Sequence, residues 1–203
     1  MKVEQFVMAY QVEQDRLRAM LPEGFESLRP VLRINAEILG EGTQIYVELN
    51  TPVAGHGKRG WLNVAHWGEE VFHYKREGEQ VTFYSPFLRI TYTGVGIQGG
   101  CPAERDNDGC FFQEETLTFL PKEEIASNRT FCNCSFAWYY GEQDAQGVSV
   151  GSASLPAIPT APQKQYDKQP LSAPYAASIP CEQILGSYTV TFEGERPQTK
   201  YAL

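Results

Sequence analysis

The sequence lacks the features of several large classes of protein. Its 17 lysines and arginines face 25 aspartates and glutamates, and the basic residues are scattered along the chain. Nucleic acids and anionic membranes attract clustered positive charge, so we expect neither as a partner. No apolar run reaches the roughly 20 residues that span a bilayer, and no long apolar segment follows Met1. We therefore expect a cytoplasmic protein.

Signatures of metal and cofactor sites are also missing. The five cysteines lack the paired spacing of structural zinc sites, and their odd number favours reduced thiols. His66 and His73, with the glutamates between them, match no recognised metal spacing. The glycine-rich G-x-x-x-x-G-K signature of phosphate-binding loops is absent. We expect no metal and no cofactor.

The stretch from Leu28 to Val53 predicts a β-hairpin with two different faces. Apolar and polar residues alternate on both sides of a glycine-rich turn around Gly40 and Gly42. The polar face carries two arginines, two carboxylates, two asparagines and a tyrosine, namely Arg29, Arg33, Asn35, Glu37, Tyr46, Glu48 and Asn50. This face is either plain solvent-exposed surface or the wall of a polar-lined cavity.

The rest of the chain predicts short strands with little helix. Hydrophobic residues at 42% and aromatic residues at 12% suffice for the core of one domain over residues 1–203. Residues 156–180 contain six prolines, which predicts a long surface excursion. Strands are expected over residues 1–12, 61–67, 71–76, 81–84, 111–119, 130–140, 148–155 and 184–192, a glycine-rich connection over 52–60, and helices over 13–21 and from 121. This pattern is typical of an antiparallel barrel or sandwich.

Three segments resemble the acetoacetate decarboxylase-like family. Tyr10–Gly24 is similar to its opening helix, Tyr46–Val53 followed by Gly60-Trp61 is similar to its strand with an inward glutamate, and Ile179–Tyr188 is similar to its closing strand. The resemblance covers about a quarter of the chain. It implies a mainly β fold, in which an antiparallel, curved, β-barrel-like sheet with short helices surrounds a central cavity. It also places Glu48 inside that cavity.

The resemblance further implies a Schiff-base mechanism, in which a protonated imine stabilises the carbanion left by decarboxylation. The lysine that forms the imine needs a lowered pKa, for which acetoacetate decarboxylase itself is the known example. This chain lacks the family's Tyr-Pro-Lys-Lys motif. Among its lysines, Lys75 alone falls within an apolar, aromatic strand pattern, with Arg76 as a neighbouring cation. The alternative is that Lys75 is an ordinary solvated lysine beside the turn at Glu77-Gly78.

Glu48 is the first candidate for acid–base catalysis. In a cavity wall its carboxyl group would have a raised pKa, or Arg33 on the neighbouring strand would hold it charged. Arg33 is also a candidate anchor for a substrate carboxylate. The alternative is an exposed Glu–Arg pair that contributes from a few tenths to about 1 kcal/mol.

Asn63, His66 and Tyr84 complete the set of candidate substrate-binding residues. His66 lies in a strand pattern close to Asn63, and histidine is the side chain whose charge changes near neutral pH. A packed or solvated strand histidine is the alternative. Tyr84 belongs to a group of aromatic residues that either pack within the sheet or line an apolar pocket.

Three functions follow from these observations. The first is a small-molecule enzyme of decarboxylase or lyase type that acts on a keto acid or related carbonyl compound, with Glu48 and Lys75 as catalytic residues. The second is a β-barrel that binds a small ligand without catalysis. The third is an assembly role through exposed sheet edges, which includes a homo-oligomer.

Overall fold

The computed structural model describes residues 1–94, 98–99, 107–141, 145–149, 164–195 and 199–203. Most of these residues form β-strands, so the predicted β class is confirmed. Within them, a larger sheet has the strand order β16-β11-β10-β5-β4-β3-β1-β15-β12-β9, with β2 paired to β4. Its strands are β1 (Lys2–Gln11), β2 (Phe25–Ser27), β3 (Val31–Leu39), β4 (Gln44–Gly55), β5 (Lys58–Gly68), β9 (Gln98–Gly99), β10 (Cys110–Gln113), β11 (Thr116–Phe119), β12 (Arg129–Phe131), β15 (Gln183–Glu193) and β16 (Tyr201–Ala202).

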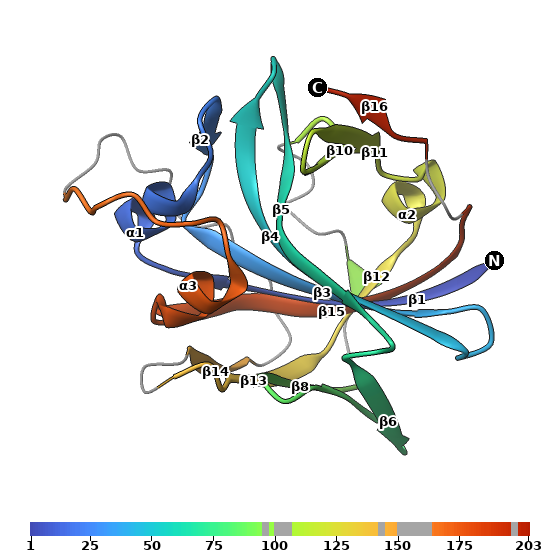
Figure 1. Ribbon diagram of the computed structural model, residues 1–203. Helices are drawn as coiled ribbons and strands as arrows, with labels where there is room; N and C mark the ends of the chain where they lie inside the picture. Colours follow the sequence, from blue (N-terminus) through green and yellow to red (C-terminus); the bar gives the residue numbers. More distant parts are fainter. Residues whose placement is uncertain (95–97, 100–106, 142–144, 150–163, 196–198) are drawn as a thin grey trace.

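A smaller sheet packs against the central strands of the larger one. Its order is β14-β13-β8-β7-β6, and in Figure 1 it lies below β1, β3 and β15. Leu32 and Ile34 of β3 belong to the same apolar core as Phe83 and Ile90 of the smaller sheet. The strands of the smaller sheet are β6 (His73–Glu77), β7 (Gln80–Tyr84), β8 (Leu88–Thr93), β13 (Asn133–Trp138) and β14 (Gln146–Ser149).

The larger sheet is curved but does not close into a barrel. Its long strands β4 and β5 bend away from β1 and β3 towards β10 and β11 (Figure 1). Within the described residues, the end strands β9 and β16 do not pair with each other, and each is only two residues long. The predicted barrel-like shape is therefore confirmed only as a curved, mainly antiparallel sheet, in which β10 runs parallel to β5.

The predicted hairpin is present as β3 and β4, and both of its faces are buried. The register pairs Arg33 with Asn50, Asn35 with Glu48, and Glu37 with Tyr46. Every residue from Val31 to Ile38 is buried, since the apolar residues of β3 face the core and its polar residues face a pocket on the other side. The polar face of the hairpin was predicted to be either solvent-exposed surface or a cavity wall, and in the structure it lines a cavity.

Two short helices agree with the sequence prediction and a third was missed. Helices α1 (Gln14–Met20) and α2 (Lys122–Ala126) lie where they were predicted. Helix α3 (Ala173–Ser178) interrupts the stretch that was predicted to be a surface excursion. The side chain of Ser172 caps α3 by accepting a hydrogen bond from the amide of Tyr175, and Pro174 lies in its first turn, where proline is tolerated. Residues 156–163 of that stretch lie outside the described residues.

Two stretches differ from the prediction in how the chain turns. The expected connection over residues 52–60 is mostly strand, and only His56 and Gly57 form its turn, with φ values of 51° and 74°. The single strand expected over 111–119 is a hairpin, which turns at Glu114 with φ of 53°. Both turns are so short that the strands on either side continue almost without a break.

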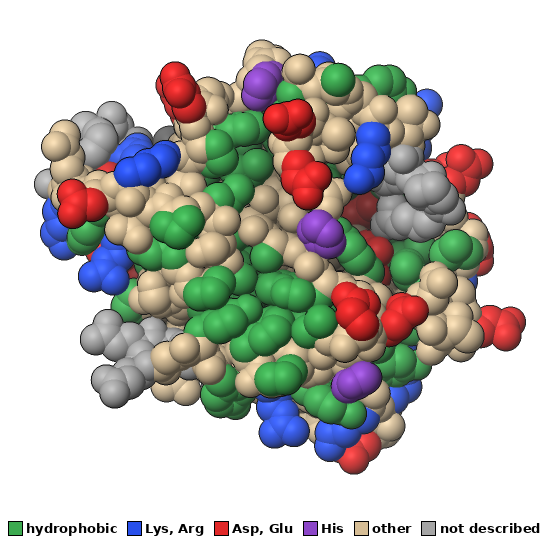
Figure 2. All heavy atoms as spheres, in the orientation of Figure 1, with side chains coloured by type: hydrophobic (Ala, Val, Ile, Leu, Met, Phe, Trp, Pro, Cys, Tyr) green, Lys and Arg blue, Asp and Glu red, His purple; other side chains and the backbone are tan. Residues whose placement is uncertain are grey.

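Among the described residues, no helix combines the length and the apolar character that crossing a membrane requires. Figure 2 shows hydrophobic side chains gathered on one face, with acidic side chains at their border. The single domain and the cytoplasmic location stay predictions.

Candidate functional site

A pocket of about 220 Å³ lies against the polar face of the hairpin. Strands β1, β3 and β4 form one wall, and β10, β11, α2 and the segment before β16 form the other. The lining residues are Gln5, Arg33, Asn35, Glu37, Leu39, Tyr46, Glu48, Phe111, Gln113, Thr118, Leu120, Glu124 and Lys200. The pocket therefore combines residues from both ends of the chain.

Glu48 is a buried carboxyl group with one oxygen fixed in place. Its Oε1 atom accepts hydrogen bonds from Nδ2 of Asn35 and Nδ2 of Asn50, both at 2.9 Å. Burial raises the pKa of Glu48, and the nearby charge of Glu37 raises it further, while the two amides and Arg33 act in the opposite direction. Because Oε1 already accepts two donors, the proton of the neutral acid belongs on Oε2.

Two further carboxyl groups, those of Glu37 and Glu124, line the pocket together with Glu48. The side chain of Gln5 donates from Nε2 to Oε1 of Glu37 and to Oε1 of Glu124, both at 3.0 Å. Gln5 and Glu37 are register partners on β1 and β3, and Glu124 comes from α2 on the opposite wall. Gln5 thereby joins the two walls of the pocket.

Arg33 lies in the same pocket as Glu48, as the sequence analysis proposed. It is 2% exposed, and its Cζ atom lies 4.6 Å from the ring centre of Trp61. Its Nη2 atom donates a hydrogen bond to the hydroxyl of Tyr188 at 3.5 Å. Its cross-strand partner is Asn50. The positive charge of Arg33 lowers the pKa of Glu48 and so partly opposes the effect of burial.

Asn63 and His66 are joined to Glu48 but do not line the pocket. Asn63 Nδ2 donates to Oδ1 of Asn50 at 3.2 Å, and its own Oδ1 lies 3.0 Å from Nδ1 of His66. His66 is exposed and also contacts the Gln113 amide at 3.0 Å. A hydrogen-bonded path thus runs from Glu48 through Asn50 and Asn63 to a histidine at the surface.

Lys75 and Tyr84 lie away from the pocket, in the smaller sheet. The side chain of Lys75 is 46% exposed and forms an ion pair with Glu77 at 3.2 Å. Tyr84 is 36% exposed and its ring lies 5.8 Å from that of His73. Neither lines the pocket that contains Glu48, so the structure does not bring the two predicted catalytic residues together.

Of the residues that line the pocket, only Arg33 and Glu48 were proposed as site residues from the sequence. Glu37 was part of the predicted polar face, and the same alternation in residues 1–12 would have found Gln5. Glu124 follows a proline at a helix start, a position that looks solvent-exposed in a sequence. Lys200 lies close to the end of the chain, and nothing in its neighbours indicates a pocket.

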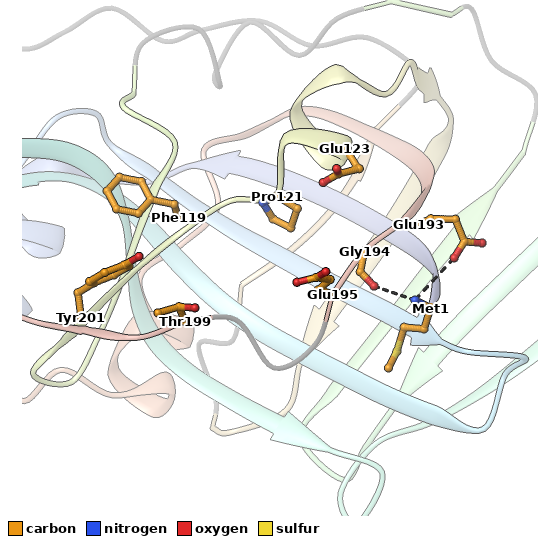
Figure 3. A pocket seen from close by; sticks show the side chains of 9 residues that line it. All are labelled: Met1, Phe119, Pro121, Glu123, Glu193, Gly194, Glu195, Thr199 and Tyr201. Carbon is orange, nitrogen blue, oxygen red and sulfur yellow. Dashed lines mark hydrogen bonds and ion pairs between the residues drawn. The ribbon is translucent and has the colours of Figure 1, made fainter.

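A larger hollow of about 580 Å³ lies on the other side of the same wall. Phe119, Pro121 and Glu123 face this hollow, whereas their neighbours Thr118, Leu120 and Glu124 face the first pocket. Figure 3 shows Glu123, Glu193 and Glu195 around the hollow, with the amino group of Met1 bonded to the carbonyl of Gly194 at 2.8 Å. Its acidic side chains are solvent-exposed, and the hollow offers no buried reactive group among the described residues.

The sequence also contains one match to the serine-hydrolase motif G-x-S-x-G. Gly147-Val-Ser149-Val-Gly151 matches the G-x-S-x-G pattern of serine hydrolases, which requires a sharp turn from a strand into a helix. The described part of this segment belongs to β14, at the edge of the smaller sheet, and its last two residues lie outside the described part of the chain. We assign it no role.

Metal-binding groups are not clustered in the described part of the chain. There, no three histidine, cysteine, aspartate or glutamate side chains lie close enough together to hold a metal ion. The carboxyl groups of the pocket are held apart by the amides of Gln5 and Asn35.

Comparison with known proteins finds the fold but no sequence relative. No protein-family model and no curated protein matches the sequence. The structure of acetoacetate decarboxylase from Legionella pneumophila is similar to this chain with a TM-score of 0.58 and 13% identity, over 100% of this chain and 86% of that one. A second acetoacetate decarboxylase structure gives a TM-score of 0.54 and 14% identity, over 100% and 88%. The resemblance inferred from the three sequence segments is confirmed at the level of the fold.

Proposed function

We propose that this chain, which has the fold of acetoacetate decarboxylase, is a small-molecule enzyme that acts on a keto acid or related carbonyl compound. The observation that carries the proposal is Glu48, a carboxyl group 6% exposed in a pocket wall with a raised pKa. A buried carboxyl group with a raised pKa keeps its proton to higher pH than an exposed one does, and such a group is suited to transfer a proton. Arg33 supplies a positive charge in the same pocket.

The geometry supports a decarboxylation in two steps. Arg33 binds the substrate and stabilises the negative charge that moves onto the carbonyl oxygen when the bond to the carboxylate breaks and carbon dioxide leaves. Glu48 then transfers the proton from Oε2 to the carbon that carried the carboxylate, and water restores the proton. A general acid contributes a factor of about 10² to 10⁴ in rate.

An amine that forms an imine would lower the barrier of the first step further. Lys75 was predicted for this role, and Lys200 is the lysine that lines the pocket. Imine formation releases water from the carbonyl group and the attacking amine, and the resulting cation accepts the electron pair in place of the carbonyl oxygen. We place the amine at Lys200, because Lys75 is held in an exposed ion pair with Glu77.

Trapping with borohydride tests both the reaction and the lysine. The chain is incubated with acetoacetate and borohydride, and its mass is measured before and after digestion. We expect a mass gain on Lys200 that is lost in Lys200→Met and kept in Lys75→Met, and release of carbon dioxide that falls by about 10² or more in Glu48→Gln. If the mass does not increase, the imine step is excluded. If neither acetoacetate nor any other β-keto acid releases carbon dioxide, the proposed decarboxylase activity is excluded.

Binding without catalysis is the second candidate function, and the exposure of the lysines favours it. All seven lysines lie within the described residues, and none of them is buried. A lysine that attacks a carbonyl group is usually desolvated. This candidate predicts saturable binding of a carbonyl compound that survives Lys75→Met, Lys200→Met and Glu48→Gln, without turnover. The homo-oligomer stays a prediction, which native mass spectrometry measures.

A further inference from the structure

The hydrogen-bonded path from Glu48 to His66 has a direction, and a backbone carbonyl group sets it. Nδ2 of Asn63 donates to the carbonyl oxygen of Ala65 at 3.1 Å and to Oδ1 of Asn50 at 3.2 Å. A backbone carbonyl oxygen can only accept a hydrogen bond. The opposite orientation of the Asn63 amide would place its oxygen against the oxygen of Ala65, so this contact excludes it.

Towards the pocket, this direction decides which atom of Asn50 faces Glu48. Asn50 accepts from Asn63 at Oδ1, so its Nδ2 atom is the one that donates to Oε1 of Glu48. The carboxyl proton therefore belongs on Oε2, which has no hydrogen-bond partner among the described residues. Oε2 is also not one of the fully enclosed side-chain atoms that lack a partner there. It is the oxygen of Glu48 that a molecule in the pocket can reach.

Towards the surface, the same direction fixes the proton of His66. Oδ1 of Asn63 can only accept and lies 3.0 Å from Nδ1 of His66, so Nδ1 carries the hydrogen and the neutral ring has its lone pair on Nε2. The amide nitrogen of Gln113 lies 3.0 Å from Nδ1 and 3.3 Å from Nε2, and only Nε2 is able to accept from it. Because Nδ1 keeps its hydrogen when the ring takes up a second proton, the path is not broken when His66 becomes charged.

The charged and titratable groups around the path do not bond to its two asparagines. These groups are Arg33, Glu37, Tyr46, Glu124 and Lys200, which line the pocket with Glu48, and Glu70, whose charge interacts with that of His66. Among the described residues, the side chains of Asn50 and Asn63 form hydrogen bonds only with Glu48, Ala65, His66 and each other. The effect of the two amides on Glu48 can therefore be measured separately from the effect of the charges.

We propose that Asn50 and Asn63 are positioning residues, which hold Glu48 by Oε1 so that Oε2 presents the carboxyl proton to the molecule bound in the pocket. Asn50 is 0% exposed and Asn63 is 7% exposed, and neither lines the pocket, so both act through Glu48. Transfer of this proton in a reaction rests on the function proposed above, whereas the positioning rests on the path alone. A carboxyl group that presents a proton recognises a hydrogen-bond acceptor, such as a carbonyl oxygen.

NMR spectroscopy of the unmodified chain tests the direction of the path. The ring nitrogen signals of neutral His66 distinguish a proton on Nδ1 from one on Nε2, and we expect Nδ1. The carboxyl carbon of Glu48 and the side-chain amides of Asn50 and Asn63 are then followed with pH. Both amides should shift at the titration midpoint of Glu48, because hydrogen bonds in a row polarise one another, whereas the amide of exposed Asn133 on β13 should not. A proton on Nε2 of neutral His66, or an Asn50 amide that does not follow Glu48, overturns the proposal.

A pair of variants tests whether the path acts on Glu48. Asn63→Leu removes the donor that holds Asn50, so Asn50 is free to turn its oxygen towards Glu48 and accept the carboxyl proton. Since this favours the neutral acid, we expect the titration midpoint of Glu48 to rise by about 0.5–1 pH unit. Asn133→Leu makes the same change at an exposed position of the smaller sheet and should leave the midpoint unchanged.

An unchanged midpoint in folded Asn63→Leu would show that the path serves only the packing of β4 against β5, and this result overturns the proposal. If Asn63→Leu does not fold, the signals of His66 and Asn50 in the unmodified chain decide.

These measurements need neither a ligand nor turnover, so they separate this inference from the proposed function. If the path has the expected direction and effect but no β-keto acid releases carbon dioxide, the positioning of Glu48 is supported and the decarboxylase is excluded. If carbon dioxide is released but the midpoint of Glu48 is the same in Asn63→Leu, the enzyme is supported and Asn63 is not a positioning residue.

Discussion

The two oxygens of Glu48 have different surroundings, and this difference defines what the residue does. Oε1 accepts from two asparagines, whereas Oε2 has no hydrogen-bond partner among the described residues. Glutamine in place of Glu48 retains an oxygen at Oε1 and places an amide at the position of Oε2. Glu48→Gln therefore removes the titrating proton with little change in shape.

The raised pKa of Glu48 predicts how the free energy of unfolding depends on pH, and Glu48→Gln tests this dependence. The folded chain binds the proton of Glu48 more tightly than the unfolded chain does, because burial raises the pKa above its usual value of 4.5. The stabilisation from this proton is complete below the usual pKa and is lost as the pH rises through the raised one. Glu48→Gln does not lose this contribution. As the pH rises over this range, we therefore expect the free energy of unfolding of Glu48→Gln to increase relative to that of the unmodified chain.

Urea unfolding of both proteins between about pH 4 and pH 8 measures the difference. Glu77→Gln replaces an exposed glutamate of the smaller sheet and serves as the control for pH effects elsewhere in the protein. A difference between Glu48→Gln and the unmodified chain that does not change with pH would show that the pKa of Glu48 is not raised.

Strand alternation was the part of the sequence that predicted structure best. Alternation in residues 28–53 identified the hairpin, its apolar face and the polar residues that face the pocket. It could not decide between solvent and cavity, because that depends on what covers the polar face. The cover comes from β10, β11 and α2, more than 50 residues further along the chain, and no local pattern encodes such a distant contact.

An irregularity in β4 and β5 explains why the path to His66 was not predicted. Asn63 and His66 are three residues apart, so regular alternation would place them on opposite faces. The register shifts beside Asn50, where Asn63 pairs with Asn50 and His66 pairs with Glu48. This bulge turns both side chains to the same face, and a bulge leaves little trace in a single sequence.

The close approach of β5 and β10 gives a prediction for Gly60. A Cβ atom at Gly60 would lie 2.5 Å from the carbonyl oxygen of Cys110, the residue that pairs with it in parallel register. Gly60→Ala must push β10 away, and β10 carries Phe111 and Gln113 of the pocket. We expect a loss of about 1–3 kcal/mol in the free energy of unfolding, measured by urea unfolding.

A glycine in open space provides the control for this change. A Cβ atom at Gly141 would meet no atom within 4 Å, so Gly141→Ala should change stability by no more than about 0.5 kcal/mol. Equal effects of the two substitutions would show that the contact between β5 and β10 is looser than the structure indicates.

At the scale of the whole molecule, the pocket and the apolar core lie on opposite faces of the same strands. The smaller sheet covers the apolar face of β1, β3 and β4, and α2 with β10 and β11 covers the polar face (Figure 1). The pocket wall is completed by Lys200, from the far end of the chain. Strand β16, which follows it, pairs with β11 at Thr116 and Leu117.

Removal of residues 199–203 tests whether this last segment belongs to the site. Its attachment includes the short pairing with β11, a hydrogen bond from the amide of Leu203 to the carbonyl of Glu115 at 3.1 Å, and an edge-to-face contact between the rings of Tyr201 and Phe119. Backbone hydrogen bonds contribute about 0.5–1.5 kcal/mol each, so we expect the shortened chain to fold with a stability lower by about 1–3 kcal/mol. Its pocket loses one side, so the dissociation constant for acetoacetate should rise about tenfold. Lys200→Met retains the strand and separates the effect of the charge from that of the wall. Unchanged affinity in the shortened chain would show that the ligand does not reach this side of the pocket, and would move the amine of the proposed imine elsewhere.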